Sequence, residues 1–384
     1  MAHHRPIARG VSSLASGARE EAHAAGASGL RATWDAAPGA ELIRIRRVES
    51  DRVIEASAPA RIDLAGGTLD LWPLHVLHPG SVTVNLAISL RAACRVGPGK
   101  DGFRVVSRAS DFEMAVGGPA ELLADPRAAL VGSLLEALEI REPLDIEFWS
   151  DVPFGSGLGG SSALTVALMG ALGRVSPRDL SGVDRVDFVR DVETRVLGKP
   201  AGVQDYYPPL EGGAHVITFR AGRTTAQRFP VDAGTWERHL TLFDSGISHS
   251  SGMNTWEILR ARLEGDPAVS ENLEGVRRAA VVMAAAVERL DFARMGQALE
   301  SEWAARRRLA PVVSTPLIER AIAAAVGAGA WGGKACGAGG GGCVVFLSPE
   351  ERTAAVRQAL AGLGEGRLVS VRAVGDGLRV EETR

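Results

Sequence analysis

The sequence of 384 residues is poor in lysine, cysteine and aromatic residues, and these shortages already exclude several kinds of protein. Its three cysteines, Cys94, Cys336 and Cys343, suggest neither a disulfide framework nor a metal-binding spacing, so we expect buried free thiols. Nearly all positive charge is arginine, which we interpret as coding bias. The formal net charge of −3, with no basic stripe, argues against a nucleic-acid partner.

Long hydrophobic runs are also missing. No apolar stretch approaches the roughly 20 residues that a membrane-spanning helix needs, so no membrane partner is expected. Residues 1–40 mix Ala, Gly, Ser, His and Arg without the apolar centre of a secretory signal. We interpret them as a disordered extension or as the product of a wrongly chosen start codon. These absences favour a cytoplasmic protein, and we expect a monomer or homodimer.

What is present is the composition of a globular protein, with 46% hydrophobic and 23% charged residues, enough for one large domain or two joined ones. A glycine–serine loop at Asp151–Ala163 is its most informative segment. Alternating apolar residues predict a strand at Leu144–Phe148 before the loop, and the apolar stretch Ala163–Leu172 predicts a buried helix after it.

That loop has the chemistry of a phosphate-binding site. Four glycines in six positions let the backbone approach a ligand closely, and successive N–H groups can form an anion-binding nest. The following helix adds unpaired N–H groups and the positive end of its dipole. Ser161 and Ser162 can donate to phosphate or hold Mg²⁺ through a hydroxyl.

Three other interpretations of the loop fit less well. It is not a P-loop, because no lysine follows the last glycine. It is not a dinucleotide-binding fingerprint, because the glycine spacing differs and no acidic residue ends a second strand about 20 residues later. A flexible linker would not lie between a buried strand and a buried helix. Phosphate binding is therefore the favoured interpretation.

Elsewhere the pattern predicts alternating strands and helices, an α+β protein. Strands are expected at Val53–Ala58, Ser81–Val96, Ala214–Phe219, Cys343–Leu347 and Arg367–Val374. A Pro/Gly-punctuated turn is expected at Ala58–Asp70. Helices are expected at Asp184–Leu197, over most of Asn254–Ala310, at Pro316–Gly327 and at Pro349–Gly362.

At this point the sequence resembles the GHMP kinase family, which includes galactokinase, homoserine kinase, mevalonate kinase and phosphomevalonate kinase. Pro153–Ala163 is similar to the central family motif, Pro59–Gly67 to the N-terminal one and Lys334–Gly342 to the C-terminal one. The three occur in the family's order. The resemblance implies ATP and Mg²⁺ as cofactors and a small-molecule acceptor.

The resemblance also implies the domain arrangement. Residues 41–230 would form the N-terminal nucleotide-binding domain, with the fold of ribosomal protein S5 domain 2, and residues 231–384 a ferredoxin-like C-terminal domain. Nucleotide and acceptor would lie between them.

Site residues follow from the matching positions. Asp205 matches the family's catalytic base; the plainer alternative is an aspartate that caps a turn. Arg61 matches an arginine beside that base; the plainer alternative is a surface ion pair. Ser162 and Glu193 match the Mg²⁺ pair, although an exposed helical Glu193 is commonplace. The nucleotide would be held by Pro153, Gly155, Ser156, Gly157, Leu158, Gly159, Gly160, Ser161 and Ser162. The acceptor would be held by Asp70, Gly66, Gly67, Gly339, Gly340 and Gly341.

The acceptor itself is left open. The extra Gly160, the string Gln204–Tyr206 and Trp331–Lys334 resemble the branch that phosphorylates heptose phosphate or fucose at the anomeric hydroxyl. Asp70 would accept sugar hydroxyls, unless it is a solvated loop residue. Arg306–Arg308 could meet a substrate phosphate, but a solvated helix face is the favoured interpretation, and His249 could line the cleft. A mevalonate-like or homoserine-like alcohol, or a non-catalytic nucleotide sensor, are the alternatives.

Overall fold

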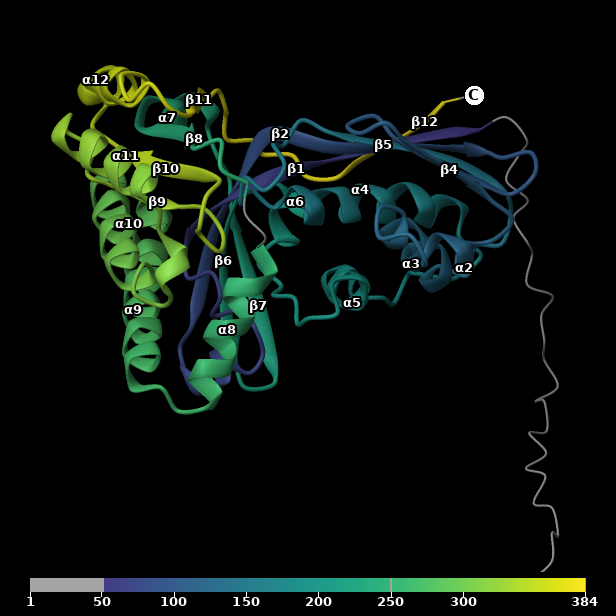
Figure 1. The fold of residues 1–384 in the computed structure, drawn as a ribbon, viewed down its shortest axis with the longest axis horizontal. Helices are drawn as coiled ribbons and strands as arrows, with labels where there is room; N and C mark the ends of the chain where they lie inside the picture. Colours follow the sequence, from purple (N-terminus) through teal and green to yellow (C-terminus); the bar gives the residue numbers. More distant parts are fainter. Residues whose placement is uncertain (1–51, 249–250, 384) are drawn as a thin grey trace, which may run out of the picture. The chain divides into compact units, whose positions relative to one another are not determined.

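The computed structural model describes residues 52–248 and 251–383, so the predicted extension at residues 1–40 lies outside the described residues. In the described part, a branched sheet of eight strands carries two of the three motifs (Figure 1). Its order is β12-β1-β2-β5-β3-β4, while β6 pairs with the other half of the long strand β2, and β7 pairs with β6. The strands are β1 (Val53–Ala65), β2 (Val82–Pro98), β3 (Phe103–Ser107), β4 (Phe112–Val116), β5 (Leu144–Ser150), β6 (Ala214–Arg220), β7 (Arg223–Phe229) and β12 (Arg379–Thr383).

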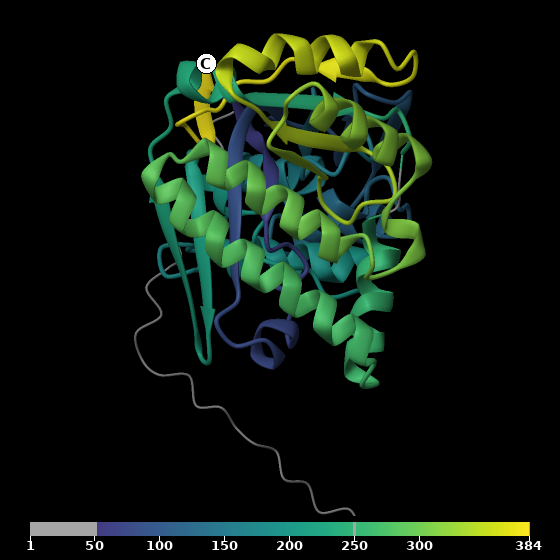
Figure 2. The ribbon, with the colours of Figure 1, turned by 90° about the vertical axis from the view of Figure 1, so that its left-hand side faces the viewer.

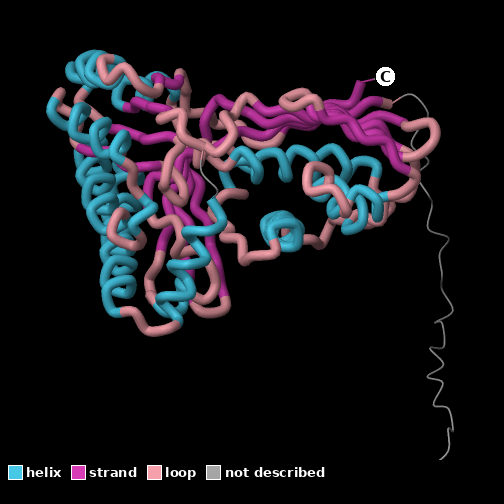
Figure 3. Tube along the Cα trace, viewed as in Figure 1, coloured by secondary structure: helices cyan, strands magenta, loops and turns pink. Residues whose placement is uncertain are grey.

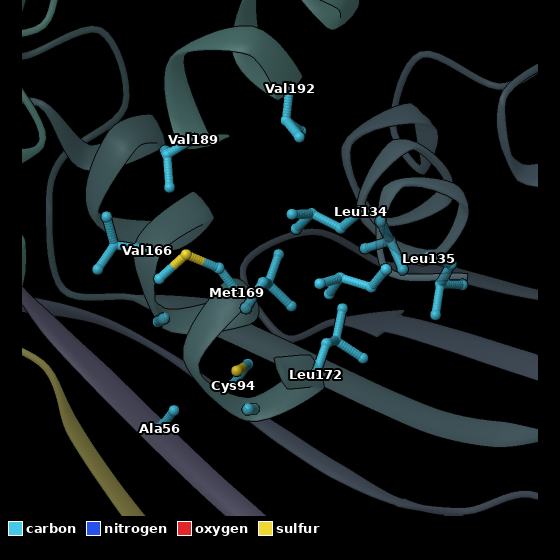
Figure 4. Close-up of a cluster of buried hydrophobic side chains, with 14 of the residues drawn as sticks. Ala56, Cys94, Leu134, Leu135, Val166, Met169, Leu172, Val189 and Val192 are labelled. Carbon is cyan, nitrogen blue, oxygen red and sulfur yellow. The ribbon is translucent and has the colours of Figure 1, made fainter. Parts of the chain in front are cut away.

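One face of this sheet is covered by helices that form the first hydrophobic core. Figure 1 shows α4 (Gly160–Val175) running beneath β1, β2 and β5, and Figure 3 shows the same layering of helix below strand. The core joins Ala56 and Cys94 of the sheet to Leu134 of α3 (Ala129–Ala137), Met169 of α4 and Val189 of α5 (Arg185–Leu197) (Figure 4). The apolar helix that follows the glycine loop is therefore fixed firmly against the sheet.

Short helices connect the strands of this part. They are α1 (Leu74–Leu77), α2 (Pro119–Leu122) and α6 (Tyr207–Glu211).

A second, four-stranded antiparallel sheet has the order β11-β8-β10-β9. Its strands are β8 (Leu240–Asp244), β9 (Gly332–Ala335), β10 (Cys343–Leu347) and β11 (Arg367–Val369). Its helices are α7 (Ala233–His239), α8 (Ser251–Leu263), α9 (Pro267–Arg289), α10 (Phe292–Arg306), α11 (Pro316–Gly327) and α12 (Glu350–Ala361). Numbered along the chain, the strand order is 4-1-3-2, which confirms the expected ferredoxin-like arrangement.

The long helices α9 and α10 lie side by side, as Figure 2 shows, and bury their apolar side chains in a core shared by both sheets. That core joins Ile62 and Leu86 of the first sheet to Met283, Leu299 and Val345. The fold is thus the expected α+β one. The proposed boundary near residue 230 stays a prediction.

Most predicted elements agree with the structure to within a few residues, and β1 is the main exception. It continues to Ala65, through the predicted turn, because the register shift at Pro59/Ala60 accommodates the proline within the strand. The predicted last strand, Arg367–Val374, ends at Val369, and a further strand, β12, pairs with β1.

The predicted state of the cysteines is confirmed, since Cys94, Cys336 and Cys343 are free and buried. Within residues 52–248 and 251–383, no helix is both long and apolar enough to cross a membrane.

Candidate active site

The glycine loop lies where the sequence predicted it, between β5 and α4. Helix α4 starts at Gly160 without a side-chain cap, so the N–H groups of its first turn are available for an anion. Gly157 adopts φ +74°, and a Cβ atom there would stand 2.4 Å from the carbonyl oxygen of Cys336. Only glycine permits this approach, which brings the strand of the C-terminal motif directly against the phosphate loop.

A buried carboxylate gathers four hydroxyl groups at the start of α4. Glu193 of α5 accepts hydrogen bonds from Ser161 (3.1 Å), Ser162 (3.0 Å), Thr165 (3.0 Å) and Tyr206 (2.6 Å). Burial raises the pKa of Glu193, although the hydroxyl donors oppose that shift. The plainer alternative, an exposed helical glutamate, is therefore wrong, because the side chain is only 6% exposed.

Arg61 and Asp205 form a bidentate ion pair beside the phosphate loop. Arg61 Nε donates to Oδ1 and Nη2 to Oδ2 of Asp205, both at 2.8 Å, and Nη1 donates to the Gly157 carbonyl oxygen. Arg61 is 3% exposed, which excludes a surface pair, whereas the Asp205 side chain remains 28% accessible. Asp205 thus remains partly accessible while its orientation is fixed by a fork of two hydrogen bonds.

Asp70 is buried against the same segment. Its Oδ2 atom accepts from the Gln204 backbone N–H at 3.2 Å, and a Cβ atom at Gly202 would overlap that carboxylate. Burial, reinforced by the negative charge of Asp205, raises the pKa of Asp70 to about 7. A solvated loop aspartate is therefore excluded, because Asp70 is only 6% exposed.

The two ends of the second glycine run pack against the phosphate loop. A Cβ atom at Gly337 would lie 3.2 Å from Gly157, and the Cys343 N–H donates to the Ser156 carbonyl at 2.8 Å. The three glycines predicted to bind the acceptor, Gly339, Gly340 and Gly341, lie against Val313 and Ile247. Their acceptor-binding role stays a prediction.

A buried ionic cluster beside Gly66 and Gly67 was not predicted from the sequence. Glu302 and Arg306 of α10, Lys334 of β9 and Asp63 of β1 are each at most 2% exposed. Lys334 Nζ lies 3.1 Å from Asp63 and 3.0 Å from Glu302, and Arg306 Nη2 lies 2.7 Å from Glu302. Burial alone would raise the pKa of Asp63, but Lys334 and the neighbouring arginines hold it low.

One prediction in this region is wrong. Arg306 was expected on a solvated helix face, together with Arg307 and Arg308, and only the last two are exposed. The i,i+4 spacing of Glu302 and Arg306 was the signal that could have revealed the pair. His249 lies outside the described residues.

Phosphoryl transfer needs a cradle for phosphate, an oriented carboxylate and fixed positive charge, and the segments that could supply them meet here. The protein is a phosphotransferase that acts on an alcohol group, and it uses ATP as the phosphate donor. Residues 127–213 match the family model described as GHMP kinases N terminal domain, and residues 283–365 match GHMP kinases C terminal, so the chain carries both GHMP kinase domains.

Similar proteins include several kinases. The chain is 27% identical over 307 residues to D-glycero-alpha-D-manno-heptose 7-phosphate kinase of Campylobacter jejuni, covering 77% of this chain and 89% of that protein. It is 28% identical over 362 residues to mevalonate kinase of Pyrococcus abyssi, covering 87% and 99%.

Solved structures share the fold. A D-glycero-D-manno-heptose 1-phosphate kinase structure from Bacteroides thetaiotaomicron matches with TM-score 0.68 at 21% identity, covering 86% of this chain and 99% of that one. Lactococcus lactis galactokinase complexed with galactose matches with TM-score 0.68 at 16% identity, covering 85% and 95%.

Proposed function

We propose that this kinase phosphorylates a sugar or sugar phosphate, at the anomeric hydroxyl of a substrate similar to heptose 7-phosphate. The observation that carries the proposal is the buried carboxylate of Asp70. It accepts a hydrogen bond from the backbone of Gln204, the residue next to Asp205 of the Arg61–Asp205 pair. A carboxylate at that place can accept hydrogen bonds from two neighbouring sugar hydroxyls. The likeness to a heptose 7-phosphate kinase supports the same acceptor.

In the proposed reaction, Asp205 is the base. The acceptor hydroxyl oxygen forms a bond to the γ-phosphorus of ATP, the bond from that phosphorus to the bridging oxygen of ADP breaks, and the hydroxyl proton passes to Asp205. Arg61 fixes the orientation of Asp205 through two hydrogen bonds and places positive charge beside the Gly157 backbone.

The hydroxyls around Glu193 fit a magnesium ion, since Mg²⁺ prefers oxygen ligands and keeps several waters. Ser162 and Glu193 would hold it, with nucleotide phosphates supplying further oxygens. When bound, the ion neutralises charge on the transferring phosphate. Ser161, Thr165 and Tyr206 orient the Glu193 carboxylate through their hydrogen bonds.

The nucleotide base has a suitable pocket beside the loop. A cavity of about 210 Å³ adjoins Ser161 and Glu193. Its walls are mainly apolar, with Leu130, Phe148 and Val196 among the lining residues. A flat, largely apolar ring bound there would leave its phosphates directed at the start of α4.

A non-sugar alcohol is the second candidate, because mevalonate kinases of several archaea match most of this chain. Asp70 discriminates between the two, since a sugar needs its carboxylate for hydroxyl binding. If Asp70→Ala leaves acceptor affinity intact, the sugar acceptor is contradicted. A cytoplasmic location and a monomeric or homodimeric state stay predictions.

The decisive experiment is a coupled ADP-release assay with Mg-ATP and a panel of acceptors: D-glycero-D-manno-heptose 7-phosphate, L-fucose, D-galactose and mevalonate. We expect turnover with the heptose phosphate. Asp205→Asn should bind ATP normally while turnover falls by about two or more orders of magnitude. Asp191→Asn, an exposed helical position, is the control and should retain turnover. Unchanged turnover in Asp205→Asn would remove Asp205 from the mechanism.

A further inference from the structure

The ionic cluster holds the segment that carries Asp70. Glu302 Oε2 accepts from the Gly66 N–H at 3.1 Å, while Arg306 donates to the Gly67 carbonyl oxygen at 2.7 Å and to the Thr68 hydroxyl at 3.3 Å. One helix of the C-terminal half therefore bonds three consecutive residues, 66 to 68, at the end of the N-terminal motif. We call residues 66–70 the acceptor loop.

The acceptor loop is held in a conformation that its own sequence disfavours. Thr68 has φ +79°, which is unusual for a β-branched residue and persists only where the surroundings impose it. Gly66 has φ +88°, and a Cβ atom there would stand 2.1 Å from the Val82 carbonyl oxygen. Arg306 bonds the carbonyl oxygen of Gly67, just before the strained residue, and the hydroxyl of Thr68 itself, so it is placed to impose that conformation.

The cluster also reaches the phosphate-loop side of the site. Lys334 belongs to β9, two residues before Cys336, whose carbonyl oxygen lies against Gly157. The ammonium group of Lys334 bridges Asp63 of β1 and Glu302 of α10. Together with Arg306, the cluster holds two positive and two negative side chains, so its net charge is zero. Three segments far apart in the sequence are thereby tied together.

We propose that Glu302, Arg306 and Lys334 are positioning residues for the acceptor, which hold the acceptor loop in its strained form so that Asp70 can meet substrate hydroxyls. The inference rests on the proposed function for its kinetic consequence. Glu302 and Arg306 bond to the backbone of the acceptor loop, and Lys334 bonds to Glu302, so the three residues act on the acceptor through that loop.

The first test replaces Arg306 by lysine. Arg306→Lys keeps a positive charge beside Glu302 but loses the planar fork that reaches Glu302, Gly67 and Thr68 together. We expect KM for D-glycero-D-manno-heptose 7-phosphate to rise about tenfold or more, because small misplacements are costly, with KM for ATP little changed. Arg307→Lys, at the exposed neighbour that pairs with Glu319, is the matched control and should leave both values unchanged.

The second test separates positioning from stability. Thr68→Gly relieves the positive φ but removes a buried side chain and the hydroxyl that Arg306 holds, so its two effects on the unfolding free energy oppose each other, while KM for the heptose phosphate should rise. An unchanged acceptor KM, whatever the resistance to urea, would overturn the proposal.

A third measurement needs no substrate. Amide hydrogen exchange of residues 66–70 should be faster in Arg306→Lys than in wild type and unchanged in Arg307→Lys. Unaltered exchange in Arg306→Lys would overturn the positioning role. Failure of every acceptor in the panel would instead count against the proposed substrate, and the exchange experiment would still test the positioning role.

Discussion

Asp70 and Asp205 are close neighbours in very different environments. Asp205 is partly accessible and carries a bidentate arginine, whereas Asp70 is buried with a backbone N–H donor. The raised pKa of Asp70 follows from burial first and from the charge of Asp205 second. Asp70 is therefore a side chain whose protonation changes near neutral pH.

The stability of the substrate-free protein should reflect that titration. Between the usual carboxyl pKa and about 7, the native state keeps a proton on Asp70 that the unfolded state has lost, so stability falls as pH rises. Asp70→Asn should remove a slope of about 1 kcal/mol per pH unit in this range, measured by urea unfolding at pH 5, 6, 7 and 8. Asp145→Asn, at an exposed position of β5, should keep the wild-type slope. A slope in Asp70→Asn equal to wild type would contradict the assignment.

At the scale of elements, the glycine loop and the C-terminal motif contact each other through backbone atoms. The glycine loop and the strand of the C-terminal motif meet at Gly157 and Cys336, and β10 continues the contact through Ser156 and Cys343. Helix α4 can present its first turn to phosphate because its apolar residues are fixed in the core.

Adding one methyl group at this contact should disrupt it. Gly157→Ala introduces a Cβ atom 2.4 Å from a backbone oxygen at positive φ, so we expect a loss of about 1–3 kcal/mol in unfolding free energy and weaker ATP binding. Gly182→Ala, where a Cβ atom meets nothing within 4 Å, should be neutral. Urea unfolding and ATP titration provide the two readouts. Normal ATP affinity in Gly157→Ala would contradict this prediction, since it would show that ATP binding does not need the close contact between Gly157 and Cys336.

At the scale of the whole described molecule, the last described strand pairs with the first. After β11, the chain returns to pair β12 with β1, the strand that carries Arg61 and Asp63. Leu378 and Val380 pack onto the first core, close to Gly170 of α4. The C-terminal sequence therefore supports the N-terminal half of the site.

Removing the residues after Gly377 should lower the unfolding free energy by roughly 2 kcal/mol or more, because two partly buried apolar side chains and a strand pairing are lost. Thermal unfolding followed by circular dichroism measures the shift. Glu381→Ala, on an exposed position of β12, should not lower the midpoint. An unchanged midpoint in the truncated protein would mean that β12 contributes nothing to stability.

The sequence predicted much of this fold from local patterns. The helix at Pro316–Gly327 and the strand at Cys343–Leu347 are confirmed with their bounds unchanged, because caps and apolar runs are local signals. β12 was missed, since Arg379–Thr383 is polar and becomes a strand only by pairing with β1. β1 was predicted too short because Pro59 suggests a turn unless a bulge accommodates it.

The sequence by itself determined the phosphate loop and the candidate residues Asp205, Arg61, Asp70, Ser162 and Glu193, because each stands at a recognisable motif position. Only the tertiary structure decided which of them are buried and what they contact. Asp63 and Lys334 lie 271 positions apart in the sequence, and their cluster with Glu302 and Arg306 comes together only through packing of α10 and β9 on the first sheet. Burial turns ordinary charged residues into a positioning group, because charges that leave water must be paired.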